Sequence, residues 1–331
     1  MKQFTRPDIS EIFTPRRPEV NDAIYVHRPN YEKEIERGVK GTLHPVVSGD
    51  SGSGKSWLYR KVLDSLNCFY LVANLANASR FGSITSEICN VCIPEGNIKK
   101  VAYDESKSAS IGALGSGGSL EHQGNYKIQQ KEPLLEAFSS LAKRAKGRTP
   151  VLVLDNLERI FDQETLMREL GDIITLIDDP NYSESKTTLL IVGVPRDIIQ
   201  YFSKTEGLAT VGNRLKEIRE VEALSEEQTF QLVHKGFVEL LKVEIEPMIL
   251  EFWKAHIYEV TLGIAQRIHE YCECLSYIVE DSGWEASYEQ IGDADIDWLG
   301  VGLKQCYHVI ESMLNEKVTK AGRRNQVLFS L

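Results

Sequence analysis

The sequence predicts an α/β fold, in which helices cover both faces of a parallel sheet, followed by an all-α C-terminal region. Strand candidates such as 151–154 and 189–192 are apolar at every position, which is typical of strands buried on both faces. Segments with helical spacing of apolar residues alternate with these strands, as crossover helices do in parallel sheets. From Leu224 onward the pattern is helical throughout, so we expect the sheet to end before that residue.

The expected elements follow one another along the chain. The strand candidates are short apolar runs that end at glycine or a polar residue: 45–48, 68–72, 151–154 and 189–192, with 218–221 as a candidate edge strand. The helix candidates lie between or before these strands, and most carry one apolar stripe: 30–39, 55–65, 134–142 and 166–177.

The chain is long enough for two domains, and its composition changes mark three regions. Residues 1–24 hold several prolines among charges and are predicted to be an extended lead-in. The α/β core is expected over 25–222 and the helical domain over 223–331. Residues 104–131, with five glycines and many serines, interrupt the core. We interpret them as a flexible surface loop, and the alternative is a glycine-rich hairpin that touches a partner subunit or nucleic acid.

Charge and composition exclude some classes of function. The chain has 38 Lys and Arg against 48 Asp and Glu, a formal net charge of −10, which argues against a surface devoted to nucleic acid or anionic membrane. No apolar run approaches the roughly 18 residues that span a bilayer, and the N-terminus shows no signal-peptide core. The six cysteines are interpreted as reduced thiols. We therefore expect a cytoplasmic protein without a membrane partner.

Residues 49–56, GDSGSGKS, match the pattern G-x-x-x-x-G-K-[ST] at every fixed position. Glycines let backbone N–H groups turn inward around a phosphate, and the positive end of the following helix points at the same anion. Lys55 would reach the β- and γ-phosphates, and the Ser56 hydroxyl would ligate Mg²⁺. The expected strand, loop and helix supply the context for a nucleotide site. Its candidate residues are consecutive: Gly49, Asp50, Ser51, Gly52, Ser53, Gly54, Lys55, Ser56 and Trp57.

Asp155 directly follows the apolar strand over 151–154. A carboxylate at that place would hold the water shell of Mg²⁺ beside Ser56. The structural alternative is an aspartate that caps the end of the strand region. Together with the phosphate-binding loop, Asp155 predicts a magnesium site made by Ser56 and Asp155 through water.

Three segments resemble one group of proteins. GDSGSGKS, VLVLDNLERI and TTLLIVGVP look like the core of AAA+ and STAND-type P-loop ATPases. The DNLER run is similar to bacterial STAND and KAP-type ATPases, whereas the strand followed by Gly193-Val194-Pro195 is more like origin-recognition-type and transposition-regulator AAA+ proteins. The resemblance covers roughly 25–275. It implies strand order 5-1-4-3-2, a helical lid, ATP and Mg²⁺ as cofactors, and rings or spirals in which a neighbour's arginine completes the site.

The resemblance also implies roles for arginines. Arg214 resembles the trans arginine finger that precedes the last core strand, and Arg219 is its rival. Arg267 resembles the lid arginine called sensor two, although that arginine is often one place nearer to Gly263. An ordinary surface cation is the alternative for Arg214 and for Arg267.

Two further family features match only in part. The strand that should carry sensor one ends in Gly193, with no Asn or Thr at its tip, while Thr187 and Thr188 lie at its start. Residues 25–28 lie where such ATPases often contact adenine.

The position after Asp155 departs from the hydrolytic pattern. Many hydrolytic members of the group place Glu there to polarise the attacking water, but this chain has Asn156, which cannot act as a base. Glu158 is the nearest alternative, and its other interpretation is a surface salt-bridge partner. Hydrolysis is therefore expected to be slow, or to depend on a group that arrives on assembly.

Three functions remain open. The first is an ATP-hydrolysing switch that forms a homo-oligomer and acts on a separate partner protein, which the resemblance associates with bacterial antiviral defence. The second is an ATP-dependent DNA-loading ATPase, for which the 104–131 insertion and the basic run 143–148 are the support. The third is a nucleotide sensor that does not hydrolyse. Cys89, Cys92, Cys272 and Cys274 are interpreted as buried thiols, with zinc ligation as the alternative.

Overall fold

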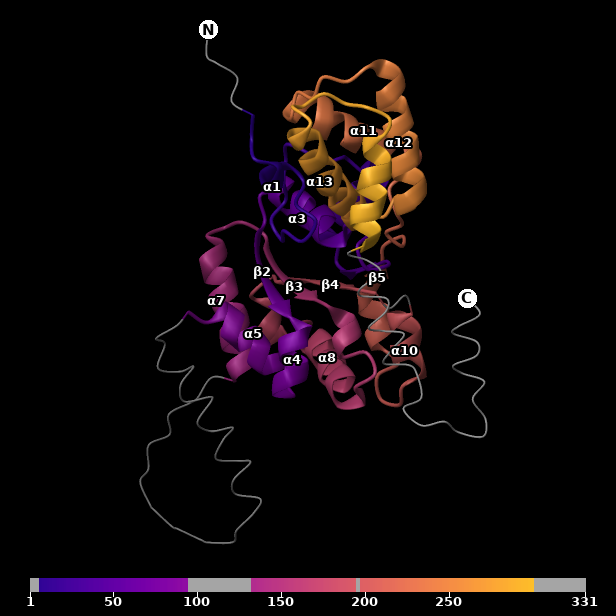
Figure 1. Ribbon diagram of the computed structural model, residues 1–331. Helices are drawn as coiled ribbons and strands as arrows, with labels where there is room; N and C mark the ends of the chain where they lie inside the picture. Colours follow the sequence, from indigo (N-terminus) through magenta and orange to yellow (C-terminus); the bar gives the residue numbers. More distant parts are fainter. Residues whose placement is uncertain (1–5, 95–131, 195–196, 301–331) are drawn as a thin grey trace, which may run out of the picture. The chain divides into compact units, whose positions relative to one another are not determined.

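The computed structural model describes residues 6–94, 132–194 and 197–300 (Figure 1). By its contacts the chain divides into two compact units, a core over 27–222 and a second unit made of 1–26 together with 223–331. The expected insertion over 104–131 lies outside the described residues.

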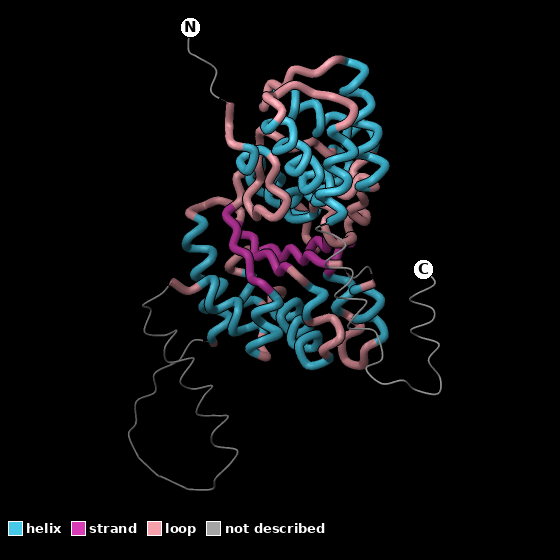
Figure 2. The backbone as a smooth tube through the Cα atoms, viewed as in Figure 1, coloured by secondary structure: helices cyan, strands magenta, loops and turns pink. Residues whose placement is uncertain are grey.

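The core unit is built on one parallel sheet, drawn in magenta in Figure 2. Its strands are β1 (His44–Ser48), β2 (Phe69–Asn74), β3 (Pro150–Asp155), β4 (Thr188–Gly193) and β5 (Leu215–Glu217). The spatial order is β2-β3-β4-β1-β5, and every neighbouring pair is parallel. Read from the other side, this is the 5-1-4-3-2 order that the resemblance implies, and the α/β prediction is confirmed.

Alternate side chains of the central strands enter two separate apolar layers. On β3, Val151 and Val153 pack on one face, whereas Leu152 and Leu154 pack on the other. All four side chains are fully buried. Burial on both faces explains why these strands are apolar at every position and do not alternate with polar residues.

Helices cover both faces of the sheet. One face is covered by α2 (Pro29–Val39) and α3 (Lys55–Ser65). The other is covered by helices that include α4, α5 and α8, which lie together below the sheet in Figure 1. The helices with buried residues on that second face are α4 (Leu75–Phe81), α5 (Ile84–Cys92), α7 (Pro133–Ala145), α8 (Glu164–Leu176), the short α9 (Pro180–Ser183) and α10 (Ile198–Lys204).

The edge strand lies three residues earlier than its prediction over 218–221. Strand β5 pairs Leu215 with His44 at the start of β1. The predicted segment still follows β1, because the N–H groups of Ile218 and Val221 donate to carbonyls of that strand at 2.9 and 2.8 Å. An edge strand is fixed by pairing on one side only, so apolar content alone did not locate it.

The second unit is helical in its described part. It contains α1 (Ile9–Ile12), α11 (Glu226–His234), a π-helical turn η3 (Lys235–Leu240), α12 (Pro247–Thr261), α13 (Ala265–Asp281) and a helix that covers 290–300. Helix α11 begins with a capping box, in which Ser225 and Gln228 bond each other's backbone N–H groups. No helix in the described ranges is long and apolar enough to cross a bilayer.

The lead-in predicted over 1–24 is packed over its described part. Ile9, Ile12 and Phe13 are buried in the second unit, and the Phe13 and Phe237 rings lie 5.3 Å apart. Gly236 leaves room for Phe13, since an added Cβ would lie 2.3 Å from that ring. The prediction of an extended lead-in was wrong because it gave weight to the prolines. Between those prolines lie one short helix and three apolar residues that are buried together.

Candidate nucleotide-binding site

The glycine-rich loop joins the carboxyl end of β1 to the amino end of α3. Gly52 and Gly54 have φ angles of 79° and 88°, a left-handed region that favours glycine. At Gly49 a Cβ would lie 2.4 Å from the carbonyl oxygen of Val221, so only glycine fits there. The local sequence therefore makes a tight turn whose backbone leads directly into a helix N-terminus.

Lys55 folds back over this loop. Its Nζ donates to the carbonyl oxygens of Gly49 and Asp50, both at 2.8 Å. Burial lowers the pKa of the Lys55 ammonium, and the negative charges of Glu158, Asp155 and Asp50 oppose that shift. The ammonium thus lies at the loop and within the field of both acidic residues that the sequence singles out.

Ser53 supplies a test of whether the loop fits a phosphate group. Its side chain is only 3% exposed, and its Oγ has no hydrogen-bond partner among the residues that the structure describes. An unpartnered buried hydroxyl costs about 1–3 kcal/mol. A bound phosphate oxygen would satisfy such a donor, and the same loop carries two left-handed glycines before a helix N-terminus. The loop residues fit a bound nucleotide.

Asp155 ends β3 with both carboxylate oxygens anchored. Oδ2 accepts from the Tyr59 hydroxyl at 3.1 Å, and Oδ1 accepts from the Asn156 N–H at 2.9 Å. Burial raises the pKa of this carboxyl, and those two bonds together with the Arg60 charge oppose the rise. A serine hydroxyl and a carboxylate are the hard oxygen donors that Mg²⁺ prefers, so Ser56 and Asp155 fit that ion.

Asn156 and Glu158 take different directions after β3. Asn156 has a left-handed backbone with φ 66°, and its Nδ2 donates to Oδ1 of Asn74 at 2.9 Å. Glu158 lies in the 3-10 turn η1 (Leu157–Arg159), and its Oε2 accepts from the N–H of Val194 at 3.1 Å. Glu158 is therefore held at the end of β4, the strand beside β3.

Gly193 makes that arrangement possible. A Cβ on Gly193 would lie 2.5 Å from the Cβ of Leu157 and 3.1 Å from Oε2 of Glu158. The glycine that replaces an Asn or Thr at the tip of β4 therefore has a packing reason. It lets the 3-10 turn carrying Glu158 approach the strand.

Arg28 links the loop to the end of the core. This buried guanidinium donates to the carbonyl oxygens of Ser53 at 2.9 Å and Glu222 at 2.6 Å. It also lies over the Tyr31 ring, 4.6 Å from its centroid. The sequence pointed to residues 25–28 for adenine contacts but did not reveal that Arg28 holds the loop backbone.

Residues 39–202 match the family described as AAA domain. The core of this chain is therefore similar to AAA domains. This match confirms the resemblance to AAA+ P-loop ATPases. A search of curated proteins finds no match to the sequence.

Solved structures share the fold of this chain at low sequence identity. The Walker-type ATPase of Pyrococcus abyssi has a TM-score of 0.59 and 14% identity, covering 91% of this chain and 79% of that chain. The ORC2 protein of Aeropyrum pernix, solved with ADPNP and ADP, gives 0.55 and 16% over 86% of this chain and 70% of its own. Cdc6p of Pyrobaculum aerophilum gives 0.51 and 16%, covering 88% and 71%.

Arg214 lies at the amino ends of the core strands, whereas the glycine-rich loop lies at their carboxyl ends. It ends the 3-10 turn η2 (Val211–Arg214), immediately before β5, and all strands are parallel. Its Nε donates to Oδ2 of Asp178 at 2.6 Å, and NH1 donates to the carbonyl of Thr210 at 3.0 Å. Within its own subunit Arg214 is therefore distant from the phosphate-binding loop and paired with a carboxylate.

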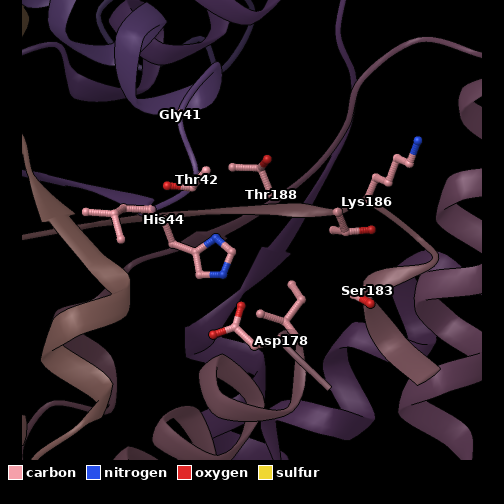
Figure 3. Close-up of a pocket in the computed structure, with 10 residues that line it drawn as sticks. Gly41, Thr42, His44, Asp178, Ser183, Lys186 and Thr188 are labelled. Carbon is pink, nitrogen blue, oxygen red and sulfur yellow. The ribbon is translucent and has the colours of Figure 1, made fainter. Parts of the chain in front are cut away.

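A cavity of about 160 Å³ opens beside this pair, at the amino ends of β1 and β4 (Figure 3). His44 accepts the Leu189 N–H at its Nδ1, 3.2 Å away, and its ring points toward Asp178 in Figure 3. Burial lowers the pKa of His44. Because ligand pockets are typically about 300 Å³ or larger, this cavity is too small for a nucleotide.

The other basic residues that the sequence singles out lie in different parts of the chain. Arg219 pairs with Glu34 on α2 at 3.4 Å. Arg267 is exposed near the start of α13, in the helical unit. In the basic run 143–148, Arg144 donates to the Cys92 carbonyl at 3.1 Å, and both Arg144 and Arg148 lie over the Phe69 ring. Those two arginines are engaged by their own domain.

Proposed function

We propose that this protein binds ATP with Mg²⁺, hydrolyses it slowly as a single subunit, and assembles into a homo-oligomer that acts on a separate partner protein. One observation carries the proposal: Lys55 lies on the glycine-rich loop within the electrostatic influence of both Asp155 and Glu158. Residues from three different places in the sequence thus meet at the carboxyl edge of one parallel sheet, where this class of fold binds its ligands.

Each residue has a distinct part in the proposed reaction. The loop N–H groups and the Ser53 hydroxyl bind phosphate oxygens, and Lys55 exchanges its two carbonyl contacts for the β- and γ-phosphates. Ser56 and Asp155 would hold Mg²⁺, which supplies charge neutralisation on the transferred phosphoryl group. Glu158 takes the proton of the attacking water, so that ATP and water give ADP and phosphate.

The proposal of slow turnover rests on Asn156 and Arg214. Asn156 offers no base, and its amide is engaged with Asn74. Arg214 lies at the amino ends of the strands, whereas the glycine-rich loop of the same subunit lies at their carboxyl ends. A neighbouring copy could present Arg214 to that loop, and an arginine supplied in trans is worth about 10³–10⁵ in turnover. Assembly would then both complete and regulate the site.

The experiment is solution mass by light scattering, without nucleotide and with Mg²⁺ plus a slowly hydrolysed ATP analogue. Wild type is compared with Lys55→Ala, Arg214→Ala and Arg219→Ala. The proposal expects an ATP-dependent oligomer that is lost in the first two variants and retained in Arg219→Ala. A monomer under every condition would overturn the homo-oligomeric part.

A nucleotide sensor that does not hydrolyse is the second candidate, and the position of Asn156 favours it. Tight ATP binding with no phosphate release, even in the assembled state at high protein concentration, would select the sensor. Turnover that rises with protein concentration would reject it, because a subunit-completed site becomes active only on assembly.

A further inference from the structure

Tyr59 connects the phosphate-binding helix to the carboxylate at the end of β3. It stands four residues after Lys55 on α3, so both residues lie on the same side of the helix. Its side chain is fully buried, and its hydroxyl donates to Oδ2 of Asp155 at 3.1 Å. Neither the nucleotide motif nor the proposed reaction assigns this tyrosine a part.

Arg60, the next residue on α3, places a positive charge beside this pair. Its guanidinium lies over the Tyr59 ring, 5.6 Å from the ring centroid. Its charge also opposes the rise that burial causes in the pKa of the Asp155 carboxyl. Because an ionised carboxylate only accepts, the proton of the Tyr59–Asp155 hydrogen bond is that of the tyrosine hydroxyl, which is therefore directed at Oδ2.

We propose that Tyr59 is a positioning residue that fixes the orientation of the Asp155 carboxylate before a divalent cation binds. With Oδ2 held by Tyr59 and Oδ1 held by the Asn156 N–H, both oxygens of the carboxylate are restrained. Each oxygen keeps a further lone pair for a metal-bound water. The inference rests on the proposed function, in which Asp155 faces Mg²⁺.

Fixing a ligand in advance reduces the conformational freedom that metal binding would otherwise remove. Loss of such an outer hydrogen bond typically weakens metal affinity about 10–100-fold. If Tyr59 only filled space in the core, replacing it with phenylalanine would leave the metal affinity unchanged, because phenylalanine fills nearly the same volume.

Tyr59→Phe removes only the hydroxyl, and Tyr70→Phe is a matched control that removes the hydroxyl of a tyrosine packed against the same apolar layer. Two affinities are measured for each protein. The first is Mn²⁺ binding to the protein–ADP complex, from the loss of the free-Mn²⁺ electron paramagnetic resonance signal. The second is binding of fluorescent mant-ADP in EDTA, which reports the loop without a metal.

The proposal expects Tyr59→Phe to weaken Mn²⁺ binding about ten-fold while mant-ADP binding in EDTA stays unchanged. Tyr70→Phe should leave both affinities unchanged. Equal Mn²⁺ affinity in Tyr59→Phe and wild type would overturn the proposal. If Tyr59→Phe does not fold, Tyr59→Met, which also lacks the hydroxyl and has a flexible apolar side chain, must weaken Mn²⁺ binding or the proposal fails. A wild-type protein that binds no mant-ADP at all would instead overturn the proposed function, and this inference with it.

Discussion

The side-chain amide of Asn156 donates to Oδ1 of Asn74 at 2.9 Å, across the carboxyl ends of two neighbouring strands. Asn74 is the strand partner of Asp155 and also caps α4 through the Ala76 N–H at 2.9 Å. The residue after Asp155 is therefore directed along the sheet edge toward β2, with its backbone in the left-handed region. Its identity reflects local structure, since asparagine tolerates that region better than most residues.

Asn156→Glu is consequently expected not to raise turnover. A glutamate would have to occupy the left-handed backbone and would lose the amide bond to Asn74, so stability should fall by roughly 1–2 kcal/mol. Asn156→Gly is the matched control, since glycine accepts the backbone without strain. Urea unfolding and phosphate release measure the two effects. A several-fold gain in turnover with glutamate would show that residue 156 does reach the nucleotide.

The sequence revealed those parts of the site that are formed by residues adjacent in the chain. The glycine-rich loop and Asp155 are each marked by a contiguous pattern, because the loop needs glycine at fixed places and the strand needs apolar residues before its carboxylate. The contacts of Arg28, Tyr59 and Asn74 could not be read in this way. They depend on which strands become neighbours, although Tyr59 stands one helical turn after Lys55 and that spacing was available.

The next prediction concerns the role of the Glu158 carboxylate in ATP turnover. Glu158→Gln keeps a carbonyl oxygen that can accept the Val194 N–H but removes the negative charge near Lys55. If Glu158 is the base, turnover in the assembled protein should fall about 100-fold with little change in ATP affinity. The exposed Glu184→Gln serves as the control for an equal charge change. Unchanged turnover in Glu158→Gln would remove Glu158 from the reaction.

The ion pair between Arg214 and Asp178 should oppose assembly. In one subunit the guanidinium is bound by a carboxylate at 2.6 Å, so its use by a neighbour requires that contact to break. Asp178→Asn should therefore shift ATP-dependent assembly to a several-fold lower protein concentration, measured by light scattering. Asp172→Asn removes an equal charge from an exposed position of α8 and should leave the midpoint unchanged. Assembly of Asp178→Asn at the wild-type midpoint would mean that the pair does not restrain Arg214.

Acid should destabilise the helical unit through His269. This fully buried imidazole accepts the Thr14 N–H at its Nδ1, 3.3 Å away, and burial lowers its pKa to about 4. The folded state therefore holds the ring neutral where the unfolded chain, with an ordinary histidine pKa near 6.5, takes up a proton. Stability contributed by the neutral ring is complete above about pH 6.5 and is lost progressively as pH falls to about 4.

The size of that loss follows from the difference between the two pKa values, and it reaches roughly 3 kcal/mol at pH 4. His269→Gln keeps a side chain that can accept a hydrogen bond but does not titrate. Its free energy of unfolding should start below that of wild type at pH 7.5 and fall less steeply between pH 6.5 and 4. Urea unfolding of both proteins across this range gives the comparison, with the exposed His27→Gln as the control. Parallel pH profiles for His269→Gln and wild type would show that another group causes the acid sensitivity.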